Sequence, residues 1–188
     1  MKKVGITGSI SSGKTTVSKI LSAGKGPFFC ADLIVKKLYS KNIFKKDISK
    51  KFNIKNSKNI KKVIIQKILE NQKNLKIIEK IIHPVVRNEI KKFIKRNKKK
   101  KFIFLEIPLL IENKLMKFFD IIIFVKAKRS VRLKRFKEKG GSKKLFTILN
   151  NKQLSDAKKI KYSDHIIVNE NNKKILKNHL LDILEKYE

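Results

Sequence analysis

Five short apolar runs alternate along the chain with longer segments of helical periodicity. The runs cover residues 2–7, 26–32, 101–110, 118–127 and 164–170. The third and fourth runs are apolar almost without a break, which is typical of strands that are buried on both faces of a parallel sheet.

The segments between the runs carry apolar residues at helical spacing. Residues 15–23 predict one helix, and residues 33–100 are helical almost throughout. Within that stretch we expect a further helix to begin at Pro84, because proline is favoured in the first turn of a helix. Residues 130–144 predict a basic helix that runs into the pair Gly140-Gly141. The last segment predicts an amphipathic helix whose apolar stripe is Leu176, Leu180, Ile183, Leu184 and Tyr187.

Strands that alternate with helices predict an α/β fold with a five-stranded, doubly wound parallel sheet flanked by helices. Such sheets bind ligands at the carboxyl ends of their strands, so the loop after the first run is a candidate site.

That loop contains a phosphate-binding motif. Residues 8–15, GSISSGKT, fit G-x-x-x-x-G-K-[ST] between a predicted strand and a predicted helix, which marks a P-loop. Its amides would surround a phosphate of ATP, Lys14 would reach the β and γ phosphates, and Thr15 would bind Mg²⁺. The alternative is a plain serine-glycine turn. We expect ATP to bind at Gly8, Ser9, Ile10, Ser11, Ser12, Gly13, Lys14, Thr15 and Thr16.

Composition narrows the remaining possibilities. The 188 residues, 41% of them hydrophobic, suit a single domain spanning 1–188. The net charge of +34 suggests a polyanionic partner, but 44 of the 49 basic residues are lysines spread over the whole chain. This pattern favours a solvated lysine surface, so we expect no specific nucleic acid partner.

One cysteine, Cys30, excludes an internal disulfide, and no apolar window is long enough to span a membrane. We therefore expect a soluble cytoplasmic protein without a membrane partner, either a monomer or a weak homo-oligomer.

Among P-loop proteins, a small-molecule kinase fits best. A GTPase needs the guanine-binding motif N-K-x-D, but residues 151–154 read NKQL, and the sequence contains no D-x-x-G. Motor ATPases are usually longer and depend on a partner subunit.

Four further stretches point to one kinase family. They are FFCADLIVKKLY with Asp32, the pair His83-Pro84, FLEIPLLIEN with Glu106 and Glu112, and KQLSDAKKIKYSDHIIVNE with Gln153, Lys159, Asp164 and Asn169. With the P-loop, this set resembles the dephospho-coenzyme A kinase family from residue 4 to residue 169. The resemblance implies that ATP phosphorylates the ribose 3′-hydroxyl of dephospho-coenzyme A, giving coenzyme A and ADP.

The resemblance also implies a division of the single domain. The core would comprise 1–32, 101–136 and 160–188, a helical acceptor-binding region would span about 33–100, and a lid would span about 137–150.

Catalytic roles follow from the same resemblance. Asp32 matches the second acid of a D-A-D pattern, the general base, although a helix N-cap is the alternative from its local sequence. Cys30 replaces the first acid and is expected to be buried packing. Glu106 stands where the family usually has Asp and would help hold Mg²⁺ through water.

The residues expected to bind the acceptor are His83, Arg87, Pro108, Leu109 and Glu112. A helix cap or buried hydrogen bond is the alternative for His83, and a surface ion pair with a lysine is the alternative for Glu112.

For the lid, Arg132 and Arg135 are candidate cations, with Arg135 the expected catalytic one. The family typically has a lid arginine a little after the position of Arg135, where this chain has Lys137 and Lys139. Asn169 matches a residue on the adenine side, or is a turn residue after the last strand. Ser9 and Ser11 replace two family glycines.

Two other functions stay open at this point. One is another small-molecule or nucleoside-monophosphate P-loop kinase, and the other is a basic nucleic-acid-binding P-loop protein.

Overall fold

The computed structural model describes residues 1–54, 59–170 and 173–188. The chain divides into two compact units, one formed by Met1–Cys30 with Phe93–Glu188 and the other by Ala31–Lys92. Within the described residues, no helix is both long and apolar enough to cross a membrane.

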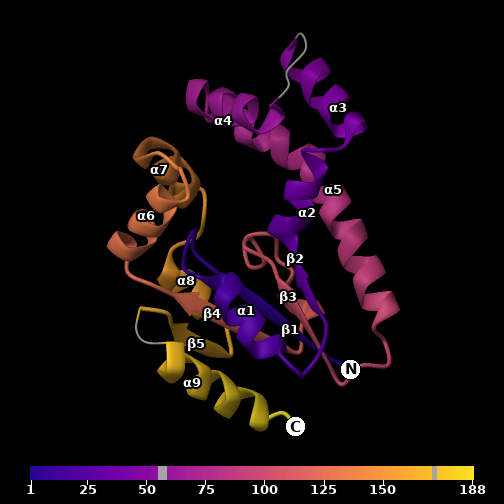
Figure 1. Ribbon diagram of the computed structural model, residues 1–188, viewed down its shortest axis with the longest axis vertical. Coiled ribbons are helices and arrows are strands. Elements are labelled where there is room, and N and C mark those ends of the chain that lie inside the picture. Colours follow the sequence, from indigo (N-terminus) through magenta and orange to yellow (C-terminus); the bar gives the residue numbers. More distant parts are fainter. Residues whose placement is uncertain (55–58, 171–172) are drawn as a thin grey trace. The chain divides into compact units, whose positions relative to one another are not determined.

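The first unit contains one sheet of five parallel strands in the order β2-β3-β1-β4-β5 (Figure 1). Each predicted apolar run forms one strand, so the predicted fold class is confirmed. The order places β1 between β3 and β4, which brings the carboxyl ends of β1 and β3 side by side. The strands are β1 (Lys2–Gly8), β2 (Phe28–Cys30), β3 (Phe102–Glu106), β4 (Ile121–Lys126) and β5 (His165–Val168).

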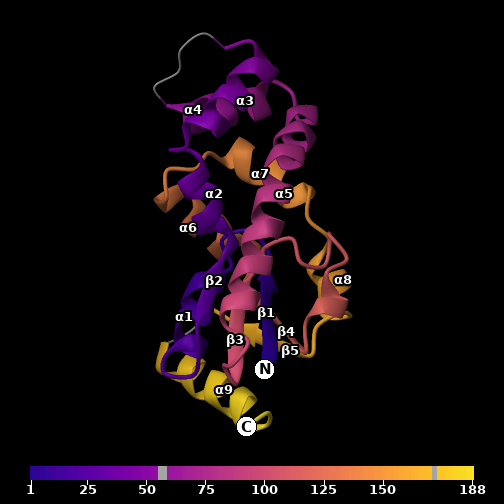
Figure 2. The same cartoon turned by 90° about the vertical axis from the view of Figure 1, so that its right-hand side faces the viewer.

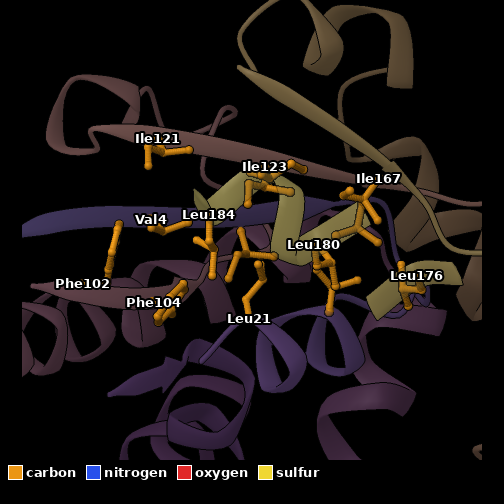
Figure 3. Packing of buried hydrophobic residues seen from close by; sticks show 14 residues of the cluster. Val4, Leu21, Phe102, Phe104, Ile121, Ile123, Ile167, Leu176, Leu180 and Leu184 are labelled. Atoms are coloured by element: carbon orange, nitrogen blue, oxygen red, sulfur yellow. The ribbon is translucent and has the colours of Figure 1, made fainter. Parts of the chain in front are cut away.

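Two helices, α1 (Lys14–Ser22) and α9 (Lys173–Glu185), pack against each other and cover one face of this sheet. Figure 3 shows Leu21 of α1 and Leu180 of α9 pointing toward strand residues such as Val4. The predicted stripe on the last helix is confirmed, because its leucines and isoleucine are buried and Tyr187 packs against the same cluster. Burial of each such side chain contributes about 1.5–3 kcal/mol, so this face anchors the sheet.

Three more helices of the first unit follow β4: α6 (Arg129–Glu138), α7 (Lys143–Asn151) and α8 (Asp156–Ile160). The glycine pair ends α6, with Gly140 at φ +81°, a backbone conformation that glycine adopts without strain. Ser142 then caps α7 by accepting a hydrogen bond from the amide of Leu145. A short 3₁₀ turn, Met116–Phe118, precedes β4.

The second unit is helical, as the apolar spacing predicted. It comprises α2 (Ala31–Leu38), α3 (Asn42–Phe52), α4 (Ile60–Glu70) and the part of α5 (Lys73–Arg96) up to Lys92. The buried residues of this unit lie four apart within α3 and α4, and the full set among its described residues is Ala31, Leu38, Phe44, Ile48, Ile60, Ile64, Ile68 and Ile78.

The helix start predicted at Pro84 is wrong. Pro84 lies inside α5, which runs without a break through 24 residues (Figure 2). A proline in a helix interior removes one amide donor and so leaves a carbonyl one turn earlier without its usual partner. Pro84 and Lys80 are both exposed, so water can satisfy that carbonyl. The apolar residues next to Pro84 are half-buried: Ile81 and Ile82 before it, Val85 and Val86 after it.

Candidate active site

The P-loop connects β1 to α1 and is closed by two glycines at positions where a side chain would collide with neighbouring atoms. A Cβ atom on Gly8 would lie 2.4 Å from the carbonyl oxygen of Val125. A Cβ atom on Gly13 would lie 1.9 Å from Nδ2 of Asn169, and its φ of +91° is also unfavourable for other residues. The loop therefore passes too close to β4 and to Asn169 for any side chain at these two positions.

Lys14 is buried and folds back over the loop. Its Nζ donates hydrogen bonds to the carbonyl oxygens of Gly8 at 3.1 Å and Ser9 at 3.0 Å. The amide of Ser12 donates to the same Ser9 carbonyl at 3.1 Å and closes the turn. The loop thus holds the ammonium group of the first residue of α1. Backbone dipoles at the N-terminus of this helix favour an anion.

A hydroxyl and a carboxylate meet between β1 and β3. Thr15, in the first turn of α1, donates from Oγ1 to Oε1 of Glu106 at 2.8 Å, and Glu106 is only 1% exposed. Glu106 ends β3 and is in register with Ile6 of β1. Both ligands are hard oxygen donors, and Mg²⁺ in nucleotide sites needs few protein ligands of this kind, so the residues present fit that metal.

Arg135 and Asn169 meet at the carbonyl of Ser12. Nδ2 of Asn169 donates to this oxygen at 2.9 Å, and Nη1 of Arg135 donates to it at 3.3 Å. Nη2 of Arg135 also donates to the backbone carbonyl of Asn169 at 3.0 Å. The guanidinium group therefore lies beside the P-loop, and the turn after β5 is fixed to the same point.

Arg132, the other candidate cation, is oriented differently. Its Nε donates to the carbonyl of Ala127 at 3.1 Å, its Nη1 donates to Oδ1 of Asn150 at 2.7 Å, and its guanidinium lies 5.8 Å from the ring centre of Phe146. Burial lowers the pKa of Arg132, while nearby Asp156 opposes that shift. These contacts join α6 to α7, so Arg132 is a structural residue of this helix pair.

Residues that follow α7 and begin α8 contact the outer turn of the P-loop. Oε1 of Gln153 accepts a hydrogen bond from the amide of Ile10 at 2.9 Å. Oγ of Ser9 donates to Oδ1 of Asp156. The family resemblance includes Gln153 but gives it no role, and nothing in the sequence distinguishes Asp156 from an ordinary acid at a helix start.

Glu112 forms an ion pair with a lysine, as its alternative predicted, but the pair is not at the surface. Oε1 of Glu112 lies 2.7 Å from Nζ of Lys159, a residue that is fully buried. The same oxygen accepts the amide of Leu154 at 3.1 Å. The turn before Glu112 is also held by its backbone, because Thr7 donates to the carbonyl of Pro108 at 3.2 Å and the amide of Asn113 donates to the carbonyl of Leu109 at 3.1 Å.

Asp32, His83 and Arg87 belong to the second unit. Asp32 is exposed in the first turn of α2, which begins at Ala31, so the N-cap alternative for Asp32 is wrong. His83 and Arg87 lie one helical turn apart on α5. Burial lowers the pKa of His83, Glu79 opposes this shift, and Arg87 adds to it. Cys30, at the end of β2, is buried as expected.

Comparisons with known proteins give one consistent family. The family model described as "Dephospho-CoA kinase" matches residues 2–174. A curated dephospho-CoA kinase of Bartonella henselae is 36% identical over 172 residues, which cover 89% of this chain and 88% of that protein.

Solved structures agree on the fold. A Thermus thermophilus crystal structure superimposes with a TM-score of 0.79 at 23% identity, covering all of this chain and 98% of that one. Dephospho-CoA kinase from Campylobacter jejuni gives a TM-score of 0.65 at 24% identity, over 98% of this chain and 96% of that one. From the family match and the curated relative together, the chain belongs to the dephospho-CoA kinase family.

Proposed function

We propose that this protein transfers the γ-phosphoryl group of ATP to the ribose 3′-hydroxyl of dephospho-coenzyme A, which gives coenzyme A and ADP. The single observation that carries the proposal is the arrangement at the ends of β1 and β3, where Lys14 lies folded over the P-loop and Thr15 contacts Glu106. The family match supplies the acceptor.

The P-loop residues would bind and orient the triphosphate. The amides of residues 8–16 and the N-terminus of α1 favour the anion, and Lys14 exchanges its carbonyl contacts for phosphate oxygens. Thr15 and Glu106 would hold Mg²⁺, Thr15 directly and Glu106 through water. When bound, the metal supplies positive charge that neutralises the developing charge on the phosphate oxygens.

Asp32 would act as the general base. The acceptor oxygen forms a bond to the γ-phosphorus, the bond from that phosphorus to the β–γ bridging oxygen breaks, and the proton of the 3′-hydroxyl passes to the Asp32 carboxylate. The family match supports this role. Asp32 is exposed, so its carboxylate is open to a substrate.

Other side chains would complete the site. Arg135 would supply the cation that stabilises charge on the transferring group, once nucleotide competes for its contact with Ser12. Asn169 would lie on the adenine side. His83, Arg87, Pro108 and Leu109 would contact the acceptor.

The test is an assay of purified protein with ATP, Mg²⁺ and either dephospho-coenzyme A or a panel of nucleoside monophosphates. We expect phosphorylation of dephospho-coenzyme A alone, and turnover of the monophosphates alone would contradict the proposal. Asp32→Asn should lower kcat by about 10²–10⁴-fold while ATP still binds. Asp47→Asn, which makes the same charge change at an exposed position on α3, is the matched control and should behave as wild type.

A further inference from the structure

The segment Gln153–Lys159 holds the outer turn of the P-loop through side chains that come from far along the sequence. Gln153 and Ile10 are 143 residues apart, and Asp156 and Ser9 are 147 residues apart. Ser9 and Ile10 are consecutive, so the segment contacts two neighbouring positions on the same side of the loop.

These two contacts act on different parts of the turn. Gln153 accepts the amide of Ile10 and so fixes the direction of one peptide unit. Asp156 accepts the hydroxyl of Ser9, whose carbonyl receives Nζ of Lys14 and the amide of Ser12. A shift of Ser9 would therefore move the position at which the Lys14 ammonium is held.

The segment is itself fixed to the turn that follows β3. Glu112, on that turn, pairs with Lys159 and accepts the amide of Leu154 through the same oxygen. Lys159 is fully buried, and a buried ammonium group stays in place only when a counter-charge holds it. The Glu112 carboxylate thus contacts the segment at Leu154, near its start, and at Lys159, where it ends.

We propose that Gln153 and Asp156 are positioning residues for the triphosphate and that the Glu112–Lys159 pair locks them against the P-loop. This inference rests on the proposed function only in assigning ATP to the loop. Among the described residues, Oε1 of Glu112 is used by this lock, while its buried Oε2 has no hydrogen-bond partner. The loop then keeps its anion-binding shape before nucleotide arrives, so less of the binding free energy is spent on ordering it.

The charge of Asp156 makes the proposal testable. A carboxylate beside a phosphate-binding loop repels ATP, so simple electrostatics predicts that its removal tightens binding. A positioning role predicts that ATP binding weakens when Asp156 loses its hydrogen-bond acceptor. It also predicts that ATP binding does not weaken when Asp156 loses only its charge.

The experiment measures binding of a non-hydrolysable ATP analogue with Mg²⁺ to the full chain by titration calorimetry, without acceptor. We expect Asp156→Ala to weaken binding by about three- to tenfold and Gln153→Ala by a similar factor, the loss of one hydrogen bond each. Asp156→Asn, which keeps an acceptor for Ser9, should bind at least as tightly as wild type. Asp182→Ala, at an exposed position on α9, controls for the change in net charge.

A double-variant cycle separates the contact from a general loss of structure. Ser9→Ala and Asp156→Ala remove the same hydrogen bond, so the double variant should bind about as weakly as either single one. Analogue binding by Asp156→Ala that equals or exceeds wild type, or full additivity with Ser9→Ala, would overturn the positioning role.

The lock is tested by separating stability from affinity. Lys159→Met alone leaves a buried carboxylate without its cation and can prevent folding, so the informative variant is Glu112→Leu with Lys159→Met. We expect this double variant to melt close to wild type and still to bind the analogue about three- to tenfold more weakly, because Leu154 has lost its acceptor. Lys158→Met, at the exposed neighbouring lysine, is the matched control. Wild-type affinity in this double variant would overturn the lock, because the loop would then keep its shape without the pair.

Failure of this inference and failure of the proposed function give different results. A wild-type protein that binds the analogue but does not phosphorylate dephospho-coenzyme A would refute the proposed function and leave the binding comparison intact.

Discussion

The substitution Gly13→Ala should damage the P-loop in two ways that can be separated. First, Gly13 has φ +91°, and a residue with a Cβ in this region costs about 1–2 kcal/mol. Second, the new Cβ would lie 1.9 Å from Nδ2 of Asn169, so the amide must move and its 2.9 Å hydrogen bond to the carbonyl of Ser12 breaks. Loss of a buried hydrogen bond costs about 1–3 kcal/mol.

The sum is about 2–5 kcal/mol, a large part of the roughly 5–15 kcal/mol that stabilises a typical domain. Urea unfolding followed by circular dichroism measures it directly. Gly24→Ala is the matched control, because Gly24 has φ +72° and, apart from its chain neighbours, no described residue has an atom within 4 Å of the new Cβ. The control should lose only about 1–2 kcal/mol, the backbone part of the effect.

The difference between the two variants isolates the contact with Asn169. It should shrink when Asn169→Ala is added to Gly13→Ala, since alanine leaves room for the new methyl group. Equal losses for Gly13→Ala and Gly24→Ala would refute the reasoning, because they would mean that the approach of Asn169 to the loop carries no free energy.

Three further outcomes follow from the same structure. Ser11 has φ +56°, so Ser11→Gly should raise the free energy of unfolding by up to about 1 kcal/mol, a Tm increase of about 2–4 °C by thermal unfolding. Glu106→Gln should raise the Mg²⁺ concentration needed for half-maximal activity by about 10-fold or more, while the urea midpoint changes little. Burial lowers the pKa of His165, whose Nε2 lies 2.8 Å from the hydroxyl of Tyr187, and the pKa of His83 is lowered in the same way. Below about pH 6.5 the unfolded chain therefore binds more protons than the folded chain, so the free energy of unfolding should fall as pH drops from 7 to 5. Urea titrations should show a smaller dependence of this free energy on pH for His165→Gln than for wild type.

The sheet could be predicted because each strand is a short apolar run between polar segments. A strand that is buried on both faces has apolar residues at nearly every position instead of apolar and polar residues in alternation. The runs at 101–110 and 118–127 could therefore be recognised as strands from the sequence. The P-loop could be predicted because its residues are contiguous, although the atoms that exclude a side chain at its two glycines come from Val125 and Asn169, far along the sequence. Local chemistry determined these features, so local sequence was sufficient to find them.

Other features depend on contacts that no local pattern encodes. Pro84 lies inside a helix in spite of the preference of proline for a helix start, because the residue is exposed and water can satisfy the carbonyl that its missing donor leaves. Arg132 and Arg135 are three residues apart on one basic helix, yet the first joins α6 to α7 and the second reaches the P-loop. The two roles differ because Arg132 meets Asn150 of α7, whereas Arg135 meets Asn169, which follows β5.

The two serines that stand at family glycine positions illustrate how one departure can have opposite consequences. Ser11 keeps the left-handed backbone that suits glycine, so its backbone is strained, and Ser11→Gly would relieve that strain. Ser9 has no such conformation, and its hydroxyl contacts Asp156, so glycine there would remove a tie between the loop and α8. The same change, serine to glycine, should therefore stabilise the protein at Ser11 and destabilise it at Ser9. The loop keeps its shape with serine at both positions because the contact of Ser9 with Asp156 offsets the backbone strain at Ser11.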